Sequence, residues 1–390
     1  MTLSLQSPHH EAPRSTPKAR VIVAQIGARM HYAVPQAFQR LGMLAHFYTD
    51  LAISPAWRRL LRCWPTAWRP ATIERLLTRD PQEIPWEQLT CLPRFGAEFH
   101  RRRRGARNDA DLARVFDWSG NAFCTHVLQS GFAREARQAD TLYTFAWGGL
   151  ELLQAAKSLG LQTITEQYIA PFIERELLAE EQERHPNWER PFDTVADQYS
   201  QDRVRQEWEV ADTILCPSAF VRDAVVQGGG AAEKCRIVPY AIDASPANPC
   251  SSPKAHAGPL RVVTVGAVGL RKGAPYLLEA ARRLAGRAHF RMVGSCHLNP
   301  AARAEMAQSV ELTGPVPRSQ VAQHLDWADV FLLPSLCEGS ATSTYEAMAA
   351  GLPVVCTHNT GSVIEDGLEG RVIPIRDPEA IVDALDELSV

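Results

Sequence analysis

The sequence predicts an α/β fold with two Rossmann-like domains, each built on a parallel sheet. Short apolar runs, typical of strands buried on both faces, alternate with stretches of helical pattern. One segment, 244–259, contains four prolines, three serines and one glycine, so it can continue neither a helix nor a central strand. A length of 390 residues also fits two domains at roughly 150 residues each.

These observations divide the chain into four parts. Residues 1–19 are polar and predicted to be a disordered tail, and 20–243 form the first domain. Segment 244–259 is the predicted linker, and the second domain covers 260–390. The predicted strands are 20–26, 142–145, 163–165, 213–216, 237–238, 262–265, 290–293, 330–333, 353–356 and 372–375. The predicted helices include 150–159, 276–284 and 342–350. Such alternation is typical of βαβ units with parallel strands.

Residues 55–135 do not follow this alternation and are predicted to be an insertion in the first domain. Between residues 55 and 115, Lys and Arg number 13 against 7 Asp and Glu, and prolines recur. Arginine interleaved with tryptophan over 55–104 suits a water–lipid interface, which predicts peripheral contact with a membrane. Two alternatives stay open: the tryptophans lie in the core, or they line a cleft that binds a glycan.

Composition narrows the function classes. The net charge of −3 gives no indication of nucleic-acid binding. No apolar run approaches the roughly 18–20 residues of a spanning helix, and the first 18 residues lack the apolar stretch of a signal peptide. Nine cysteines without a C-x-x-C pair are typical of reduced thiols. We therefore expect a cytoplasmic protein, with the membrane contact, where it forms, at the inner membrane.

Two segments of the second domain carry the residues expected to do chemistry. In Gly266–Gly273, a glycine loop after a strand places Arg271 and Lys272 where parallel sheets bind ligands. In 332–355, an apolar strand is followed by a loop with Glu338 and then by a helix whose N-terminus favours an anion. Glu346 lies one turn inside that helix, within reach of a ribose. This combination predicts a diphosphate, a ribose and a sugar bound side by side.

Glu338 and Glu346 form a Glu-x7-Glu pair, and the surrounding EGSATSTYEAMAAGLPVV resembles the donor-site signature of retaining family 4 glycosyltransferases, also described as glycosyl transferases group 1. The resemblance continues through VGAVGLRKGAPYLLEA, RMVGS, ELTGPVP, WADVFLLPSLCEG and GSVIEDGLEG of the second domain. In the first domain it includes QIGARMHYAVPQAF, ADTILCPSAFV and KCRIVPYAIDA, but nothing over 55–135. The resemblance implies a GT-B fold, two Rossmann-like domains facing each other across a cleft.

The resemblance also assigns roles. It implies that Arg271 and Lys272 hold the diphosphate, that Glu346 binds the ribose and that Glu338 contacts the transferred sugar. Arg271, Lys272 and Glu338 are thus the expected catalytic residues. The remaining expected donor-binding residues are Gly27, Ala28, Gly266, Gly294, Gly339, Ser340, Ala341 and Thr342.

Three departures from the family pattern qualify these roles. Ala267 stands where the family often has Arg, so Arg271 is expected to supply that charge. Glu166 and Gln167 stand near a usual His, and both remain candidates for an acceptor or sugar contact. The family usually continues past the last strand with a helix that crosses back to the first domain. This sequence ends at Val390, so either that crossover is missing or the sequence is a fragment.

The function predicted from these features is a retaining glycosyltransferase of the hexosyltransferase type. It would move a sugar from a nucleotide-diphosphate sugar to a hydroxyl of a glycan, a lipid-linked or a small-molecule acceptor, in polysaccharide or glycolipid biosynthesis. No metal and no cofactor are expected, because cations and helix N–H groups meet the diphosphate charge. Two alternatives remain: a sugar-nucleotide epimerase or phosphorylase of the same fold, and a non-catalytic sugar-nucleotide-binding module.

Overall fold

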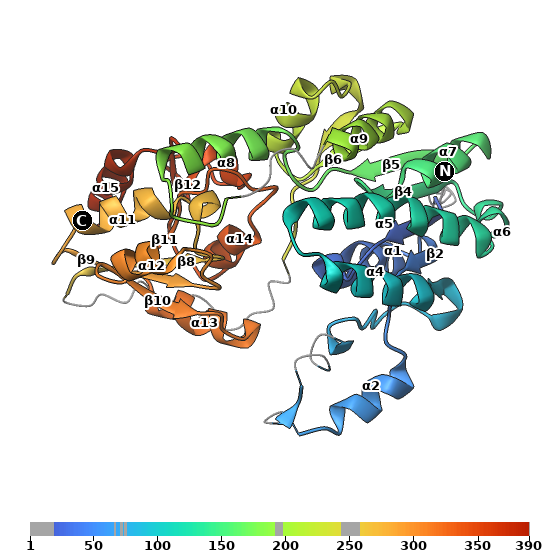
Figure 1. The fold of residues 1–390 in the computed structure, drawn as a ribbon, viewed down its shortest axis with the longest axis horizontal. Helices are drawn as coiled ribbons and strands as arrows, with labels where there is room; N and C mark the ends of the chain where they lie inside the picture. The colour runs from blue at the N-terminus through green and yellow to red at the C-terminus, as the bar shows by residue number, and fades with distance from the viewer. Residues whose placement is uncertain are drawn as a thin grey trace, which may run out of the picture.

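The computed structural model describes residues 19–389, apart from 66–67, 71–72, 74–75, 192–197 and 243–257. Two α/β domains lie side by side, the first coloured blue to yellow-green and the second orange to red (Figure 1). Residues 1–18 of the predicted tail and most of the predicted linker lie outside the described residues. The first strand of the second domain begins at Leu260.

The first domain is built on a sheet of seven parallel strands. The strands are β1 (Val21–Gln25), β2 (Leu44–Thr49), β3 (Leu89–Cys91), β4 (Thr141–Phe145), β5 (Gln162–Glu166), β6 (Thr213–Cys216) and β7 (Cys235–Ile237). The helices are α1 (Ala33–Arg40), α2 (Pro55–Arg62), α4 (Pro93–Gly105), α5 (Asp109–Gln129), α6 (Phe132–Ala136), α7 (Leu150–Ser158), α8 (Ile173–Arg184), α9 (Gln198–Val210) and α10 (Ala219–Gln227).

The second domain is built on a sheet of six parallel strands. The strands are β8 (Leu260–Val265), β9 (Ala288–Val293), β10 (Val310–Gly314), β11 (Val330–Leu333), β12 (Val354–Thr357) and β13 (Gly370–Ile373). The helices are α11 (Ala274–Arg283), α12 (Pro300–Met306), α13 (Arg318–Trp327), α14 (Thr342–Ala349) and α15 (Pro378–Glu387).

Both sheets have the strand order of a Rossmann fold. The orders are β3-β2-β1-β4-β5-β6-β7 and β10-β9-β8-β11-β12-β13. In each sheet the chain reverses its direction of growth between the first and the fourth strand, β1 beside β4 and β8 beside β11. Ligands of such sheets bind outside the carboxyl ends of the strands at this reversal. The fold therefore predicts sites in the loops after these four strands.

Alternating burial explains why both sheets are covered on both faces. In β1, Ile22 packs into one cluster with residues of α5 and α7, whereas Val23 packs into another with residues of α1. In β8, Val262 packs with α11 and α15, whereas Val263 packs with α14. Successive side chains of a strand point to opposite faces, so apolar runs without alternation are buried on both sides. The prediction of parallel sheets from these runs is confirmed.

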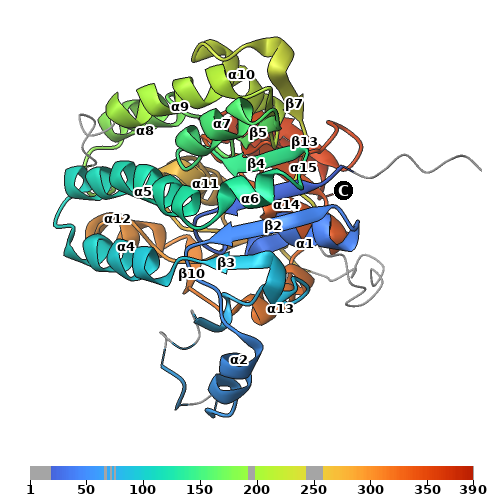
Figure 2. The same ribbon diagram turned by 90° about the vertical axis from the view of Figure 1, so that its right-hand side faces the viewer.

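The segment predicted as one insertion, 55–135, divides into two parts in the structure. Its second part belongs to the domain itself: β3 pairs with β2, and α4 and α5 bury Phe95, Phe99 and Phe123 in the core. Only the part between β2 and β3 leaves the body, carrying α2, which projects away from both sheets in both views (Figures 1 and 2). The predicted insertion was too long because β3 was not recognised as a strand. Its three residues are too few to give a clear apolar run.

Strands β2 and β10 were not predicted from the sequence either. Both strands contain a polar residue at their centre or end, His46 in β2 and Thr313 in β10, which interrupts the apolar run. Every strand that was predicted is present, with its ends shifted by at most two residues. Among the residues that the structure describes, none of the helices is both long and apolar enough to cross a membrane.

Candidate functional site

The loop after β8 holds two of the expected catalytic cations. Gly266 and Gly273, with φ of +148° and +70°, adopt backbone conformations that favour glycine. A Cβ at Gly273 would collide with the Pro334 carbonyl, so the loop packs directly against the end of β11. Between the glycines, Leu270–Lys272 form one 3-10 turn, which presents Arg271 and Lys272 to the second loop of the site.

Glu338, in the loop after β11, binds both cations. Its Oε2 accepts from Arg271 Nη1 at 2.8 Å, and its Oε1 lies 2.6 Å from Lys272 Nζ. Burial alone would lower the pKa of Arg271, but the adjacent Glu338 raises it above its usual value. Lys272 is only 7% exposed, so this contact is shielded from solvent. The three expected catalytic residues therefore form one ionic cluster, although Glu338 lies 67 positions after Arg271 in the chain.

The start of α14 supplies backbone donors beside this cluster. Among the described residues, the N–H groups of Gly339 and Ser340 have no hydrogen-bond partner. The N–H of Ala341 is already used, since it donates to the Thr360 carbonyl at 3.0 Å. The helix N-terminus can thus offer some, not all, of the donors expected from Gly339 to Thr342.

The other expected donor-binding residues of this domain have distinct surroundings. Glu346 lies on α14, 24% exposed at its side chain, and accepts from Arg318 Nη2 at 2.9 Å. Gly294, with φ of +152°, packs so closely on the loop after β8 that a Cβ would collide with the Gly266 carbonyl. In this structure Gly294 thus supports the loop that carries the cations.

The loop after β1 is the glycine loop of the first domain that was expected to bind the donor. Gly27 has φ of +79°, and its N–H donates to Asp50 Oδ1 at 2.9 Å. Met30, His31 and Tyr32 follow with φ of 47°, 52° and 64°, three successive non-glycine residues in the left-handed region. Each such residue costs about 1–2 kcal/mol, and strain of this kind gathers at ligand-binding loops.

Arg29 is a residue of this loop that the sequence analysis did not single out. Its guanidinium lies 3.4 Å from the centroid of the Tyr168 ring, and its buried Nε has no hydrogen-bond partner among the described atoms. A buried guanidinium nitrogen without a partner is costly unless a ligand satisfies it. The available signal was its place directly after Gly27 and Ala28 in the glycine loop.

Glu166 and Gln167, at the end of β5, differ in their availability. Glu166 accepts hydrogen bonds from the hydroxyls of Tyr143 and, at 3.1 Å, Tyr240, and burial raises its pKa. Gln167 is fully buried; its Oε1 accepts from Trp208 Nε1 at 3.1 Å and its Nε2 donates to the Ile169 carbonyl at 3.0 Å. In this arrangement both ends of the Gln167 amide are used within the first domain.

The two domains meet directly at the expected catalytic loop. Ser218, after β6, donates to the Gly339 carbonyl at 2.6 Å. A Cβ at Gly339 would collide with the Tyr168 carbonyl, so only glycine fits this approach. Glu174, at the start of α8, brings Oε1 to 4.0 Å from Arg271 Nε. The first domain therefore contacts the second at both of its site loops.

The segment 170–191, which we name the crossing segment, leaves the first domain after β5 and packs on the second. Its helix α8 lies over the second domain (Figure 1). Glu181 is fully buried, and its carboxylate accepts from Tyr276 Oη at 2.6 Å and Arg376 Nε at 2.8 Å. Glu189 accepts from the N–H of Leu270 at 2.6 Å, which fixes the turn that carries Arg271 and Lys272.

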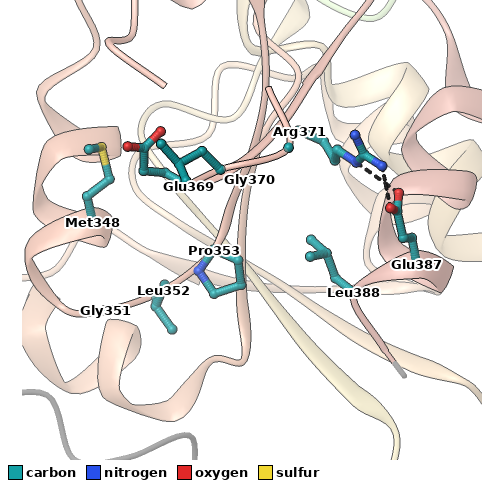
Figure 3. A pocket seen from close by; sticks show the side chains of 11 residues that line it. Met348, Gly351, Leu352, Pro353, Glu369, Gly370, Arg371, Glu387 and Leu388 are labelled. Carbon is teal, nitrogen blue, oxygen red and sulfur yellow. Dashed lines mark hydrogen bonds and ion pairs between the residues drawn. The ribbon is translucent and has the colours of Figure 1, made fainter. Parts of the chain in front are cut away.

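Figure 3 shows a pocket at the amino ends of the strands of the second sheet, opposite the ends that carry the site. The pocket lies where β12 and β13 begin, and Pro353 and Gly370 are among the residues that line it. Arg371 and Glu387, which form an ion pair, also line it. Because ligands of parallel sheets bind at the carboxyl ends, this pocket is not part of the site. Within the described residues, no group of three or more His, Cys, Asp or Glu side chains is placed to hold a metal ion.

Comparison with known proteins agrees with this geometry. The glycosyl transferases group 1 family model matches residues 259–389. The amylovoran biosynthesis glycosyltransferase AmsK of Erwinia amylovora is 33% identical over 147 residues, which cover 34% of this chain and 36% of that protein. The putative colanic acid biosynthesis glycosyltransferase WcaL of Salmonella typhimurium is 32% identical over 154 residues, covering 35% and 38%. The chain spans little more than a third of the length of these relatives in the match.

Solved structures match over nearly the whole chain. Anabaena Alr3699/HepE in complex with UDP has a TM-score of 0.58 at 13% identity, covering 94% of this chain and 89% of that one. The lipopolysaccharide outer core galactosyltransferase WaaB has a TM-score of 0.55 at 14% identity, covering 94% and 90%. At these identities the likeness concerns the fold alone. Residues 259–389 thus match the glycosyl transferases group 1 family model, and the two domains together have the GT-B fold.

Proposed function

We propose that this protein is a retaining glycosyltransferase that moves a sugar from a nucleotide-diphosphate sugar to an acceptor hydroxyl. The observation that carries the proposal is the ionic cluster of Arg271, Lys272 and Glu338 at the carboxyl ends of β8 and β11. Two cations suit a diphosphate, and a carboxylate beside them suits the hydroxyls of the attached sugar. The UDP in the structure of Alr3699/HepE is a diphosphate of the kind proposed here.

In the proposed reaction the bond from the sugar to the diphosphate breaks through an oxocarbenium-like state. Arg271 Nη1 and Lys272 Nζ donate to the leaving diphosphate oxygens as their charge develops, with the free N–H groups at the start of α14. Glu338 then exchanges its present contact with the cations for the hydroxyls of the sugar. Glu346 binds the ribose and orients the nucleotide. The first domain holds the acceptor, whose hydroxyl oxygen bonds to the sugar carbon from the side of the loop after β1, on the face that the diphosphate leaves, and whose proton passes to the leaving diphosphate.

Further parts of the proposal concern metal and location. Diphosphate charge is met by side chains and N–H groups, so neither metal nor cofactor is required. The proposed location is the cytoplasm, supported by eight described cysteines that are all free. Peripheral contact with the inner membrane through 55–104 is proposed because Trp57 and Trp68 on this segment are 61% and 81% exposed.

The experiment that tests the function is a panel of nucleotides and nucleotide sugars in a thermal-shift assay, followed by transfer assays with each donor that binds. A ligand at 100 times its Kd adds about 2.7 kcal/mol to the free energy of unfolding. We expect a nucleoside diphosphate and its sugar to raise the melting temperature of the wild type, but not of Lys272→Ala. If no nucleoside diphosphate raises the melting temperature of the wild type, the proposal is overturned. Free sugar released from donor alone as its epimer, or an absolute need for inorganic phosphate, would identify the other enzyme classes.

A further inference from the structure

Two pockets of opposite character adjoin each other on the first domain. The basic pocket is lined by Arg79 and by His100, Arg103 and Arg104 of α4. The apolar pocket is lined by Ile53, Trp57, Leu61 and Trp86, among others. Leu51 and Leu76 line both pockets, so the two form one continuous surface.

The basic pocket carries uncompensated positive charge. Arg79 is neutralised by Asp50, whose fully buried carboxylate lies 2.7 Å from Arg79 Nη1. Partial burial, and then the charge of Arg79, lower the pKa of His100, so His100 is neutral at pH 7. Arg103 and Arg104 have no carboxylate within ion-pair distance among the described residues. Two positive charges therefore remain to meet an anion.

The helix itself separates these cations from their neighbours. Positions 100, 103 and 104 share one face of α4, as residues three and four apart do on a helix. Arg101 and Arg102 face elsewhere: both pair with Glu98, and Arg102 also lies 4.1 Å from the centroid of the Trp118 ring. The run of four arginines thus contains two paired and two unpaired members. Guanidinium groups bind phosphate oxygens in a two-pronged geometry, which suits a phosphate ester.

The apolar pocket extends this site in the direction of the projecting segment. Its lining presents almost only apolar surface, although Trp57 is 61% and Trp86 44% exposed. An apolar groove that continues from a cationic pocket is complementary to an amphipathic anion, with its charge at one end and a hydrocarbon chain at the other. The positive charge of the adjoining pocket therefore favours an apolar molecule with an anionic end over one without charge.

The loop after β1 adjoins the basic pocket. Ala28, one of the expected donor-binding residues, also lines the basic pocket. The Asp50 carboxylate links the two places, since it accepts from Gly27 N–H at 2.9 Å and from Arg79. The order is therefore the loop after β1, then the cations, then the apolar groove.

From this order we propose that the acceptor hydroxyl belongs to a group carried on a lipid phosphate or diphosphate. Its phosphate binds Arg103 and Arg104, the first part of its hydrocarbon chain lies in the apolar pocket, and the group beyond the phosphate reaches the loop after β1. This inference rests on the proposed function for the reaction, but the binding site stands on its own residues. It also gives the exposed tryptophans a role at the membrane from which such a lipid would be drawn.

Binding of a short lipid phosphate tests the proposal separately from catalysis. The probe is farnesyl phosphate, used below its micelle concentration and followed by calorimetry, with farnesol and inorganic phosphate as its two halves. We expect the wild type to bind the probe at least tenfold more tightly than either half. R103Q/R104Q should bind it 10- to 100-fold more weakly, the loss expected for charge-assisted hydrogen bonds. The matched control R101Q/R102Q should stay within about twofold, and W57A should weaken only the probe and farnesol.

Each other outcome contradicts the proposal. If farnesol binds as tightly as the probe, the site is only an apolar groove. If both double variants lose the same affinity, the arginines attract the probe by charge without a specific site. Binding to anionic phospholipid vesicles but not to the monomeric probe would identify a membrane surface as the partner. Lys272→Ala should leave probe binding intact, since loss there would place the probe on the donor cations. If the probe fails while UDP still binds, the lipid inference falls and the proposed function stands.

Discussion

The two domains share a strand order but differ in how their sites are encoded. In the second domain, two short segments, 266–273 and 334–346, supply the cations, both glutamates and the helix N-terminus. In the first domain, the expected donor-binding residues and those that contact the second domain come from loops and helices spread over nearly 200 positions, from Gly27 to Ser218. A nucleotide diphosphate is bound largely by local backbone geometry, whereas an acceptor is bound by surface shape.

Under the proposed function, the second domain binds the diphosphate through local geometry, whereas the first binds the acceptor through tertiary contacts. A glycine turn and a helix N-terminus recognise phosphate through geometry that a few adjacent residues dictate. The basic and apolar pockets of the first domain instead depend on how α4, the loop after β2 and the projecting segment meet. The predictions below test whether the donor and acceptor functions are as separable as the two domains suggest.

The largest effect is expected at Glu338, compared with Glu346. Glu338→Ala should abolish transfer while leaving the affinity for the nucleoside diphosphate nearly intact, because this carboxylate serves the sugar. Glu346→Ala should weaken binding of the nucleoside diphosphate itself, because it serves the ribose. Calorimetry with the nucleotide product, beside a transfer assay, measures both. Equal losses of affinity in the two variants would contradict this division of roles.

The next largest effect is expected at Lys272. Lys272→Ala should lower kcat/KM by roughly 10²–10³, the loss typical of one preorganised donor to developing charge. The buried position of Lys272, 2.6 Å from Glu338, supports a role that water does not replace. Steady-state kinetics with the true donor measure it. Arg282→Ala, which breaks a half-exposed ion pair with Glu305 on the same domain, is the control and should keep its rate. Unchanged turnover in Lys272→Ala would remove this lysine from the leaving-group site.

The sequence was informative where function depends on adjacent residues and uninformative where it depends on tertiary contact. The parallel strands and the cluster of Arg271, Lys272 and Glu338 followed from apolar runs and one motif. The crossing segment did not, because α8 is a strongly charged helix whose pattern does not indicate that it covers the second domain. Glu181 looks like any surface glutamate in the sequence, but its partners Tyr276 and Arg376 come from 95 and 195 positions away.

Glu189 tests whether the crossing segment couples the two domains. Its carboxylate accepts from Leu270 N–H at 2.6 Å, at the turn that holds Arg271 and Lys272. Glu189→Ala removes an acceptor worth about 1.5–3 kcal/mol for a charged group, so kcat/KM should fall about tenfold. As a positioning residue, Glu189 should affect kcat more than the affinity for the nucleoside diphosphate.

Two further variants control for the charge and for the fold. Glu189→Gln keeps an oxygen acceptor and should recover most of the rate. Glu183→Ala removes an exposed carboxylate of the same segment and should have no effect. A similar loss in Glu183→Ala, or no rescue by Gln, would mean that the segment matters for stability and not for the donor loop.

The smallest effect is expected from metal removal, which tests whether the second domain meets the diphosphate charge with its own residues. If the second domain carries its own cations for the diphosphate, the reaction needs none from solution. Arg271 Nη1 and Lys272 Nζ both lie within 3 Å of the Glu338 carboxylate, so two positive charges already meet at one point. Treatment with EDTA should therefore leave the initial rate of transfer unchanged within error, and adding Mg²⁺ or Mn²⁺ back should not raise it. A rate that falls with EDTA and is restored by titrating one of these ions would show that Arg271 and Lys272 do not suffice for the leaving diphosphate.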